Sequence, residues 1–88
     1  MERSLREYLN TPLVDLPGNK RIYDDRDSDG NLYINWYDGR GLLLYGITVR
    51  PNGFVHTANR TTDDFQVLPM NRESKLIILQ DLRHLHLL

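Results

Sequence analysis

The sequence predicts a mainly β fold, in which roughly four to six short antiparallel strands form a curled sheet or a small open barrel, with one short N-terminal helix packed against it. Three observations predict this class. Short runs of alternating apolar and polar residues fill the middle of the chain, and Asp-Gly and Asn-Gly turns separate these runs. The length of 88 residues, with 40% apolar content, supplies one hydrophobic core, so residues 1–88 are expected to form a single small domain.

The N-terminal helix is predicted from Glu2 to Leu9, among good helix formers. Leu5, Tyr8 and Leu9 have helical spacing and would share one face. The helix is expected to end at the Asn10-Thr11-Pro12 segment.

The next segment, TPLVDLPGNK, holds two prolines and a Pro17-Gly18-Asn19 turn, so it indicates an extended connector. We expect its aliphatic side chains to cover the core. These side chains are Leu13, Val14 and Leu16. A first strand is predicted to follow from Lys20 to Asp24.

Alternation is clearest in residues 31–38, which predict a strand with two different faces. One face carries Leu32, Ile34 and Trp36, and the other carries Tyr33, Asn35 and Tyr37. After a glycine-containing turn, residues 42–50 predict the next strand. One face of this strand is expected to carry Leu43, Tyr45, Ile47 and Val49.

A three-residue hairpin turn, Pro51-Asn52-Gly53, is predicted to connect this strand to the one that follows. Proline pre-sets φ at the first turn position, and glycine accepts the left-handed conformation at the third. In the resulting register we expect Val49 to lie opposite Val55. Ile47 then lies opposite Thr57.

The C-terminal part of the chain leaves two alternatives open. Residues 65–70 are predicted as a strand after a polar turn. The tail NRESKLIILQDLRHLHLL then fits either another strand at residues 75–79 or a helix capped by Asn71, with one apolar stripe of Ile78, Leu82 and Leu85. The plausible hairpin loop before KLIIL favours the strand, whereas a helix would make the class α+β.

Composition excludes several classes of protein. Cysteine is absent, which excludes a disulfide framework and a zinc–thiolate site, and no stretch approaches the roughly 20 apolar residues of a membrane-spanning helix. Without a signal-like N-terminus, we expect a cytoplasmic protein in which the Asn59-Arg60-Thr61 sequon serves strand or turn chemistry. The net charge of −1 argues against a general nucleic-acid binder.

The stretch DRDSDGNLYINW, Asp25 to Trp36, has carboxylates at its first, third and fifth positions and glycine at its sixth. Over about eight residues it resembles the DxDxDG loops of the EF-hand and dockerin group, which implies a calcium site. The implied ligands are Asp25, Asp27, Asp29 and Asn31. Trp36 replaces the bidentate ligand at the twelfth position, and a strand pattern follows at once. We therefore favour an acidic hairpin tip, in which Asp and Gly serve turn geometry.

Histidine offers a second candidate metal site. His84 and His86 would share one face if the tail were a strand, and His56 could add a third ligand for a transition metal. On a helix, positions two apart diverge and the site fails. The favoured alternative is that these histidines are polar positions alternating with Leu85 and Leu87.

Aromatic and basic residues in the middle of the chain suggest an alternative function, the binding of single-stranded nucleic acid on a small β-barrel. Tyr33 and Tyr37 share one strand face, on which bases could stack. The cations of this region are Arg40, Arg50 and Arg60. The scarcity of lysine and the negative net charge argue against this function.

Catalytic signatures are absent: there is no cysteine nucleophile, no GxSxG or HExxH motif and no phosphate-binding glycine loop. We therefore expect neither an enzyme nor a cofactor, and predict a protein-binding module of accessory, regulatory or inhibitor type that self-associates. The C-terminal LRHLHLL is the expected pairing segment, because it is more apolar than a frayed tail. The predicted protein-binding residues are Asp25, Asp27, Asp29, Tyr33, Tyr37, Leu85 and Leu87.

Overall fold

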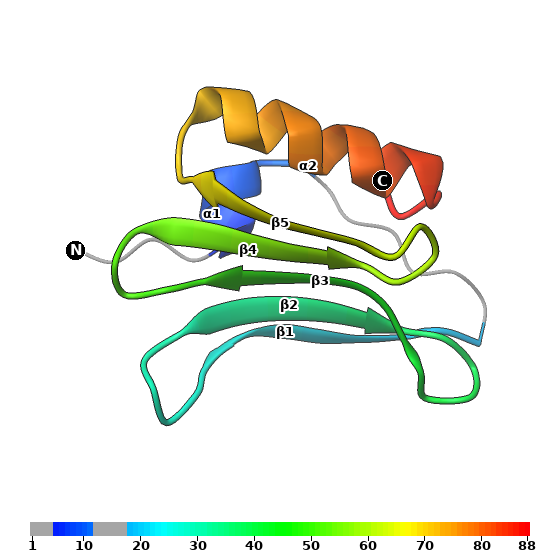
Figure 1. The fold of residues 1–88 in the computed structure, drawn as a ribbon. Coiled ribbons are helices and arrows are strands. Elements are labelled where there is room, and N and C mark those ends of the chain that lie inside the picture. Colours follow the sequence, from blue (N-terminus) through cyan, green and yellow to red (C-terminus); the bar gives the residue numbers. More distant parts are fainter. Residues whose placement is uncertain (1–4, 12–17) are drawn as a thin grey trace.

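The computed structural model describes residues 5–11 and 18–88, which form five strands and two helices (Figure 1). The helices are α1 (Leu5–Leu9) and α2 (Arg72–His84). The strands are β1 (Lys20–Arg26), β2 (Leu32–Tyr37), β3 (Leu43–Val49), β4 (Phe54–Asn59) and β5 (Asp64–Pro69). The connector predicted over Leu13, Val14 and Leu16 lies outside the described residues.

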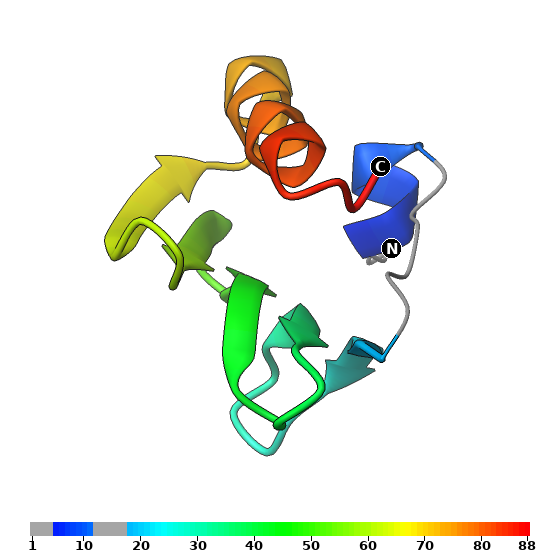
Figure 2. The same ribbon diagram turned by 90° about the vertical axis from the view of Figure 1, so that its right-hand side faces the viewer.

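The strands form one antiparallel sheet in sequence order, so each strand pairs with its neighbours along the chain. Viewed along the strands, the sheet curls without closing, and both helices lie on its open, concave side (Figure 2). β1 and β5 remain as the two edge strands. The predicted open, curled antiparallel sheet with an N-terminal helix is confirmed, and the second helix makes the class α+β.

The core lies between the concave face of the sheet and the helices. The sheet contributes the buried side chains of Ile34, Trp36, Tyr45, Ile47 and Val55. The helices and the C-terminal residues contribute Leu5, Leu9, Ile78, Leu79, Leu82 and Leu87. The predicted core face of residues 31–38 is thus confirmed, because Ile34 and Trp36 are both fully buried.

Three of the hairpin turns have the same construction, and they span residues 27–31, 38–42 and 50–54. In each turn the first residue donates its N–H to the C=O of the fifth, and the fourth residue, a glycine with positive φ, donates to the C=O of the first. The predicted Pro51-Asn52-Gly53 turn is confirmed, with Gly53 at a φ of +87°. The predicted register is also confirmed, with pairs Val49–Val55 and Ile47–Thr57.

The strand predicted at residues 75–79 is wrong, because this segment lies inside helix α2. Asn71 caps the helix, as the alternative expected: its side-chain oxygen accepts a hydrogen bond from the Ser74 N–H at 2.9 Å. The physical reason is coverage of the sheet. A helix brings Ile78 and Leu82 onto one stripe that buries the concave face, whereas another strand would leave that face open.

A bulge in β3 corrects a second prediction. Trp36 pairs with Tyr45 but Tyr37 pairs with Leu43, so Leu44 is an extra residue in β3. The extra residue reverses the alternation of side chains at this point. Leu43 therefore lies on the opposite face from Tyr45, not on the same face.

Hydrogen bonds from two tyrosines join α2 to the rest of the fold. Tyr45 Oη donates to Asp81 Oδ2 at 2.9 Å, and Tyr8 Oη of α1 donates to the Asn71 carbonyl at 2.6 Å. Burial raises the pKa of the Tyr45 hydroxyl, and the adjacent Asp81 carboxylate raises it further. The Tyr45 hydroxyl therefore stays protonated in the folded chain and continues to donate.

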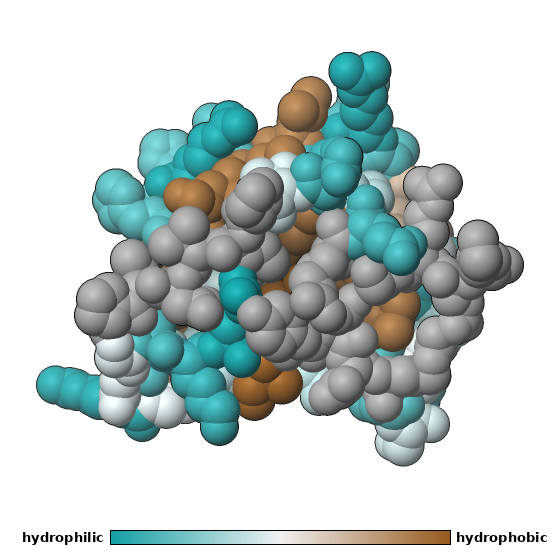
Figure 3. All heavy atoms as spheres, turned by 180° about the vertical axis from the view of Figure 1, so that it is seen from behind, coloured by the Kyte–Doolittle hydropathy of each residue, from teal (hydrophilic) through white to brown (hydrophobic). Residues whose placement is uncertain are grey.

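Not every apolar residue of α2 faces the core. Leu76 is 59% exposed and Ile77 is 39% exposed. Seen from behind, brown hydrophobic atoms extend over the top of the molecule, where α2 lies, among teal hydrophilic side chains (Figure 3). The helix thus offers buried and exposed leucines for direct comparison.

The contribution of the α2 stripe can be measured by a matched pair of leucine substitutions. We expect Leu82→Ala, at a fully buried position, to lower the free energy of unfolding by about 2–5 kcal/mol, because it leaves a cavity in the core. The same change at exposed Leu76 is expected to cost less than about 0.5 kcal/mol. Urea unfolding measures both values, and equal losses would contradict the assignment of the buried face.

The hydrogen bond of Tyr45 gives a second prediction. We expect Tyr45→Phe to lower the free energy of unfolding at neutral pH by about 1 kcal/mol, because Asp81 loses its donor. Because the folded-state pKa of Tyr45 lies above its unfolded value of 10.0, its contribution is present below pH 10 and lost as the pH rises. Denaturant unfolding at neutral and alkaline pH should therefore show a steeper alkaline loss for the wild type. Parallel losses in the two proteins would contradict this.

Candidate functional site

The convex face of the sheet, on the side away from the helices, carries side chains that do not belong to the core. Strand register arranges them in rows that cross β2, β3, β4 and β5. One row is Asn35, Gly46, Ala58 and Phe65, and the next is Tyr33, Thr48, His56 and Val67. Tyr33 and Tyr37 share this outer face as predicted, and both are half-buried.

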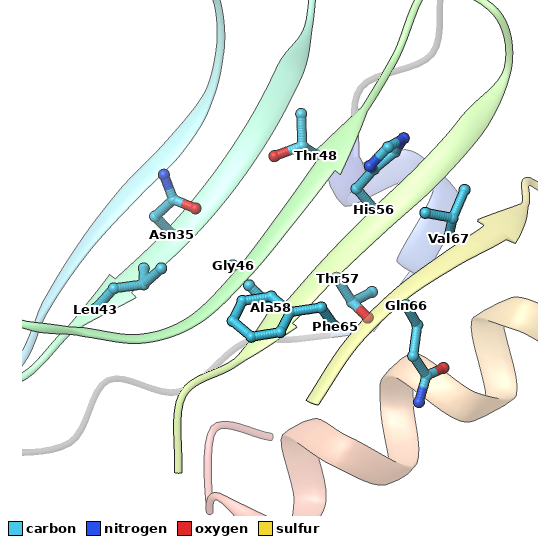
Figure 4. Close-up of a pocket in the computed structure, with 10 residues that line it drawn as sticks. All are labelled: Asn35, Leu43, Gly46, Thr48, His56, Thr57, Ala58, Phe65, Gln66 and Val67. Atoms are coloured by element: carbon cyan, nitrogen blue, oxygen red, sulfur yellow. The ribbon is translucent and has the colours of Figure 1, made fainter. Parts of the chain in front are cut away.

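A shallow hollow of about 260 Å³ lies in this face (Figure 4). Gly46 leaves room for it, since a Cβ at this position would come within 2.7 Å of Asn35 Oδ1. The Phe65 ring lies beside Ala58, its strand partner, whereas Gln66 points to the other side, towards α2. The hollow is therefore framed by an aromatic ring on one side and polar side chains on the other.

Three large apolar side chains remain exposed on the outer face of β4 and β5, and we call them the β4–β5 patch. Phe65 is 60% exposed, Val67 is 61% exposed and Phe54 is 43% exposed. The Arg60 guanidinium carbon lies 5.9 Å from the centre of the Phe65 ring, at the rim of the patch. Sequence reasoning missed this patch, although the alternation in DFQVLP places Phe65 and Val67 on one face.

The basic residues of the nucleic-acid alternative are not brought together. Arg40 and Arg60 lie in turns at one end of the sheet, after β2 and β4. Arg50 lies in the turn after β3, at the opposite end. All three are exposed, but the length of the strands separates Arg50 from the other two.

The acidic loop is a hairpin turn built around Asp27. Asp27 Oδ1 accepts hydrogen bonds from the backbone N–H groups of Asp29 at 2.9 Å and Asn31 at 3.0 Å, and its Oδ2 accepts from Asn31 Nδ2 at 3.0 Å. The bonds from Asn31, above all, hold the pKa of this carboxyl below its ordinary range. Asp29 is exposed, and the side chain of Asp25 lies outside the described part. Asp27 thus directs both oxygens to the turn itself.

Metal ligation receives no support from the described residues, among which no group of three histidines or carboxylates could hold an ion. His84 ends helix α2 and His86 follows it in the left-handed conformation, so the strand face predicted for this pair does not exist. The third residue of that candidate, His56, lies on the outer face of β4. Asn59 of the sequon is buried and accepts hydrogen bonds from Thr61, which fits turn chemistry.

The C-terminal residues differ most from expectation. Leu87 is fully buried and Leu85 packs against the core, so neither belongs to a free apolar tail. His86 N–H donates to the Arg83 C=O and Leu87 N–H to the Leu82 C=O, a Schellman-type helix end that turns Leu87 into the core. Leu87 therefore has no exposed surface left for pairing through this segment, and the binding role of Leu85 and Leu87 stays a prediction.

Comparisons with protein-family models, with curated proteins and with solved structures found no match to this chain. Within the described ranges, neither helix has the length and apolarity that crossing a membrane requires.

The role of Asp27 can be tested by substitution. We expect Asp27→Ala to lower the midpoint of thermal unfolding at pH 7, because the turn loses an acceptor of three hydrogen bonds. Asp29→Ala is the matched control, because its exposed carboxylate accepts no hydrogen bond in this described turn. A calcium-dependent rise of the wild-type midpoint would contradict the turn interpretation.

The same variant has a defined pH dependence. Because the folded-state pKa of Asp27 lies below its ordinary value of 3.8, its contribution is present above that pH and lost as the pH falls through the folded pKa. The difference in midpoint between wild type and Asp27→Ala should therefore shrink between neutral pH and about pH 2.5. A constant difference across this range would show that the carboxylate charge is irrelevant.

Proposed function

We propose that this chain is a non-enzymatic, cytoplasmic protein-binding module of accessory, regulatory or inhibitor type, and that the β4–β5 patch is its contact surface. The observation that carries the proposal is the exposure of Phe65 and Val67, side by side on the outer face of an edge strand. Covering apolar surface contributes about 25 cal/mol per Å². A partner seated here would gain this free energy without unfolding any part of the core.

The surroundings of the patch support a protein partner. The hollow beside Phe65 can receive a side chain, and Thr48, His56 and Asn35 supply hydrogen-bonding groups at its margin. An apolar centre with a polar rim is typical of protein interfaces, in which aromatic residues and arginine are enriched. Arg60, stacked near Phe65, supplies such an arginine.

A nucleic-acid partner is less well supported. Single strands bind along a continuous basic groove that follows their phosphates. Here Arg40 and Arg60 lie at one end of the sheet and Arg50 lies at the other, where its charge helps to lower the pKa of Asp27. The cations therefore do not form one track beside Tyr33.

The proposal is tested by capture of host proteins on the purified, tagged chain, quantified by mass spectrometry. Phe65→Thr and Val67→Thr remove the apolar patch but retain residues suited to strands. We expect both variants to lose the proteins that the wild type captures. Leu42→Thr is the matched control, because Leu42 is as exposed as Val67 but lies in the turn after β2, outside the patch. Equal capture by all four proteins would overturn the proposal.

A further inference from the structure

Among the described strands, none pairs with the outer edge of β5, and the backbone groups on that edge have a defined direction. The Phe54 C=O accepts from the Arg50 N–H at 2.9 Å, so alternate β4 residues, beginning with Phe54, direct their backbone groups to β3. The other residues of β4 direct theirs to β5. Their partners on β5 are Asp64, Gln66 and Leu68. By the same alternation, the N–H and C=O groups of Phe65 and Val67 face the free edge.

We propose that a second copy of this chain is the partner, and that the two copies pair through β5, antiparallel about a two-fold axis at Gln66. Phe65 then lies opposite the partner's Val67, and the two can exchange a pair of backbone hydrogen bonds. The two-fold axis also places Val67 opposite the partner's Phe65. Four backbone hydrogen bonds then join the two sheets into one continuous sheet. The proposal rests on the proposed function, since it uses the same patch.

Side-chain chemistry agrees with this arrangement. Phe65 and Val67 of both copies meet on the outer face, where each covers apolar surface of the other. Gln66 lies on the inner face opposite the partner's Gln66, and a side-chain amide can both donate to and accept from its equivalent. The strand is therefore complementary to itself about this axis.

Pro69 favours this register over the one with its axis at Val67. An axis at Val67 would place Phe65 opposite the partner's Pro69, which has no N–H to donate. With the axis at Gln66, Pro69 lies opposite Asp63, outside the paired strand. In the register with its axis at Gln66, the backbone N–H groups of Phe65 and Val67 in both copies therefore all find an acceptor.

Charge also favours the antiparallel direction. Asp63 and Asp64 stand at the start of β5, and Arg72 follows its end as the first residue of the 13-residue helix α2. Antiparallel pairing brings the acidic start of one strand towards the partner's Arg72 and the positive end of the helix dipole. A parallel arrangement would instead set the two acidic starts side by side. Arg60, beside Phe65, offsets one of the two aspartates, and the charges of Glu73 and Lys75 offset each other, so one negative charge and that of Arg72 remain.

Sedimentation equilibrium of the purified chain tests the pairing. Stable complexes bury roughly 800 Å² of surface on each partner, and a pair of six-residue strands buries less. We therefore expect weak dimerisation, with a dissociation constant of roughly 10–100 µM. Val67→Pro removes an N–H of the free edge but no bond to β4, and proline is tolerated in edge strands. We expect it to raise the dissociation constant at least about tenfold. Circular dichroism checks that the variant is folded.

A cross-link tests the register independently. The chain has no cysteine, so one introduced thiol reports on one pair. The axis sets the two Gln66 Cα atoms about 4.5 Å apart, within the range of a disulfide. We expect Gln66→Cys to form a covalent dimer on mild oxidation, whereas Gln80→Cys, exposed on α2, remains monomeric.

The outcomes separate this inference from the proposed function. A wild-type chain that stays monomeric at about 1 mM overturns self-pairing, while capture of a different protein that Phe65→Thr abolishes would leave the proposed function intact. A dimer that Val67→Pro leaves unchanged, or equal cross-linking of both cysteine variants, overturns pairing through β5. Conversely, a β5 dimer that captures no other protein identifies the second copy as the partner.

Discussion

The concave face of the open sheet carries large apolar side chains, and the fold has a buried core only because the two helices cover that face. Five strands curl without closing, so Trp36 and Tyr45 on the inner side need a partner layer. Helix α1 has only five residues, and α2 therefore supplies most of the cover through Ile78 and Leu82. Each fully buried side chain of this size contributes about 1.5–3 kcal/mol. The bond from Tyr45 to Asp81 then holds the helix in position over the sheet.

This use of the C-terminal segment determines which surfaces are left for partners. Because α2 and the turn after it bury Leu82 and Leu87, the end of the chain has little apolar surface to share. Phe65 and Val67 stay exposed on the convex face, at the edge strand β5, as Leu76 and Ile77 do on the outer side of α2. The bulge at Leu44 adds to this surface by turning Leu43 outward to the hollow beside Gly46. The buried core and the exposed side chains of Phe65 and Val67 thus lie on opposite faces of one sheet.

The acidic loop shows how turn chemistry can imitate a metal motif. Asp27 begins a turn whose fourth residue is glycine, and its carboxylate accepts two backbone N–H groups of that turn. Asp38 begins the next turn of the same construction and accepts the N–H groups of Arg40 and Leu42 in the same way. Only the first of these two turns has the spacing of a calcium loop. The aspartate and the glycine at its core are therefore explained by hairpin geometry, which both turns require.

The strands of the middle of the chain, their turns and the register of the central hairpin could be predicted from the sequence, because alternation and turn residues act between near neighbours. The sequence also marked Tyr33 and Tyr37 as outer-face residues. The helix at residues 75–79 could not be predicted in this way. KLIIL fits a strand or a helix by its local pattern, and the helix forms because an apolar stripe on it covers the concave face of the sheet. The bulge at Leu44 could not be predicted either, because regular alternation places Leu43 on the same face as Tyr45. The candidate site depended on the same long-range facts, since the burial of Leu87 and the exposure of Phe65 follow from which surface α2 covers.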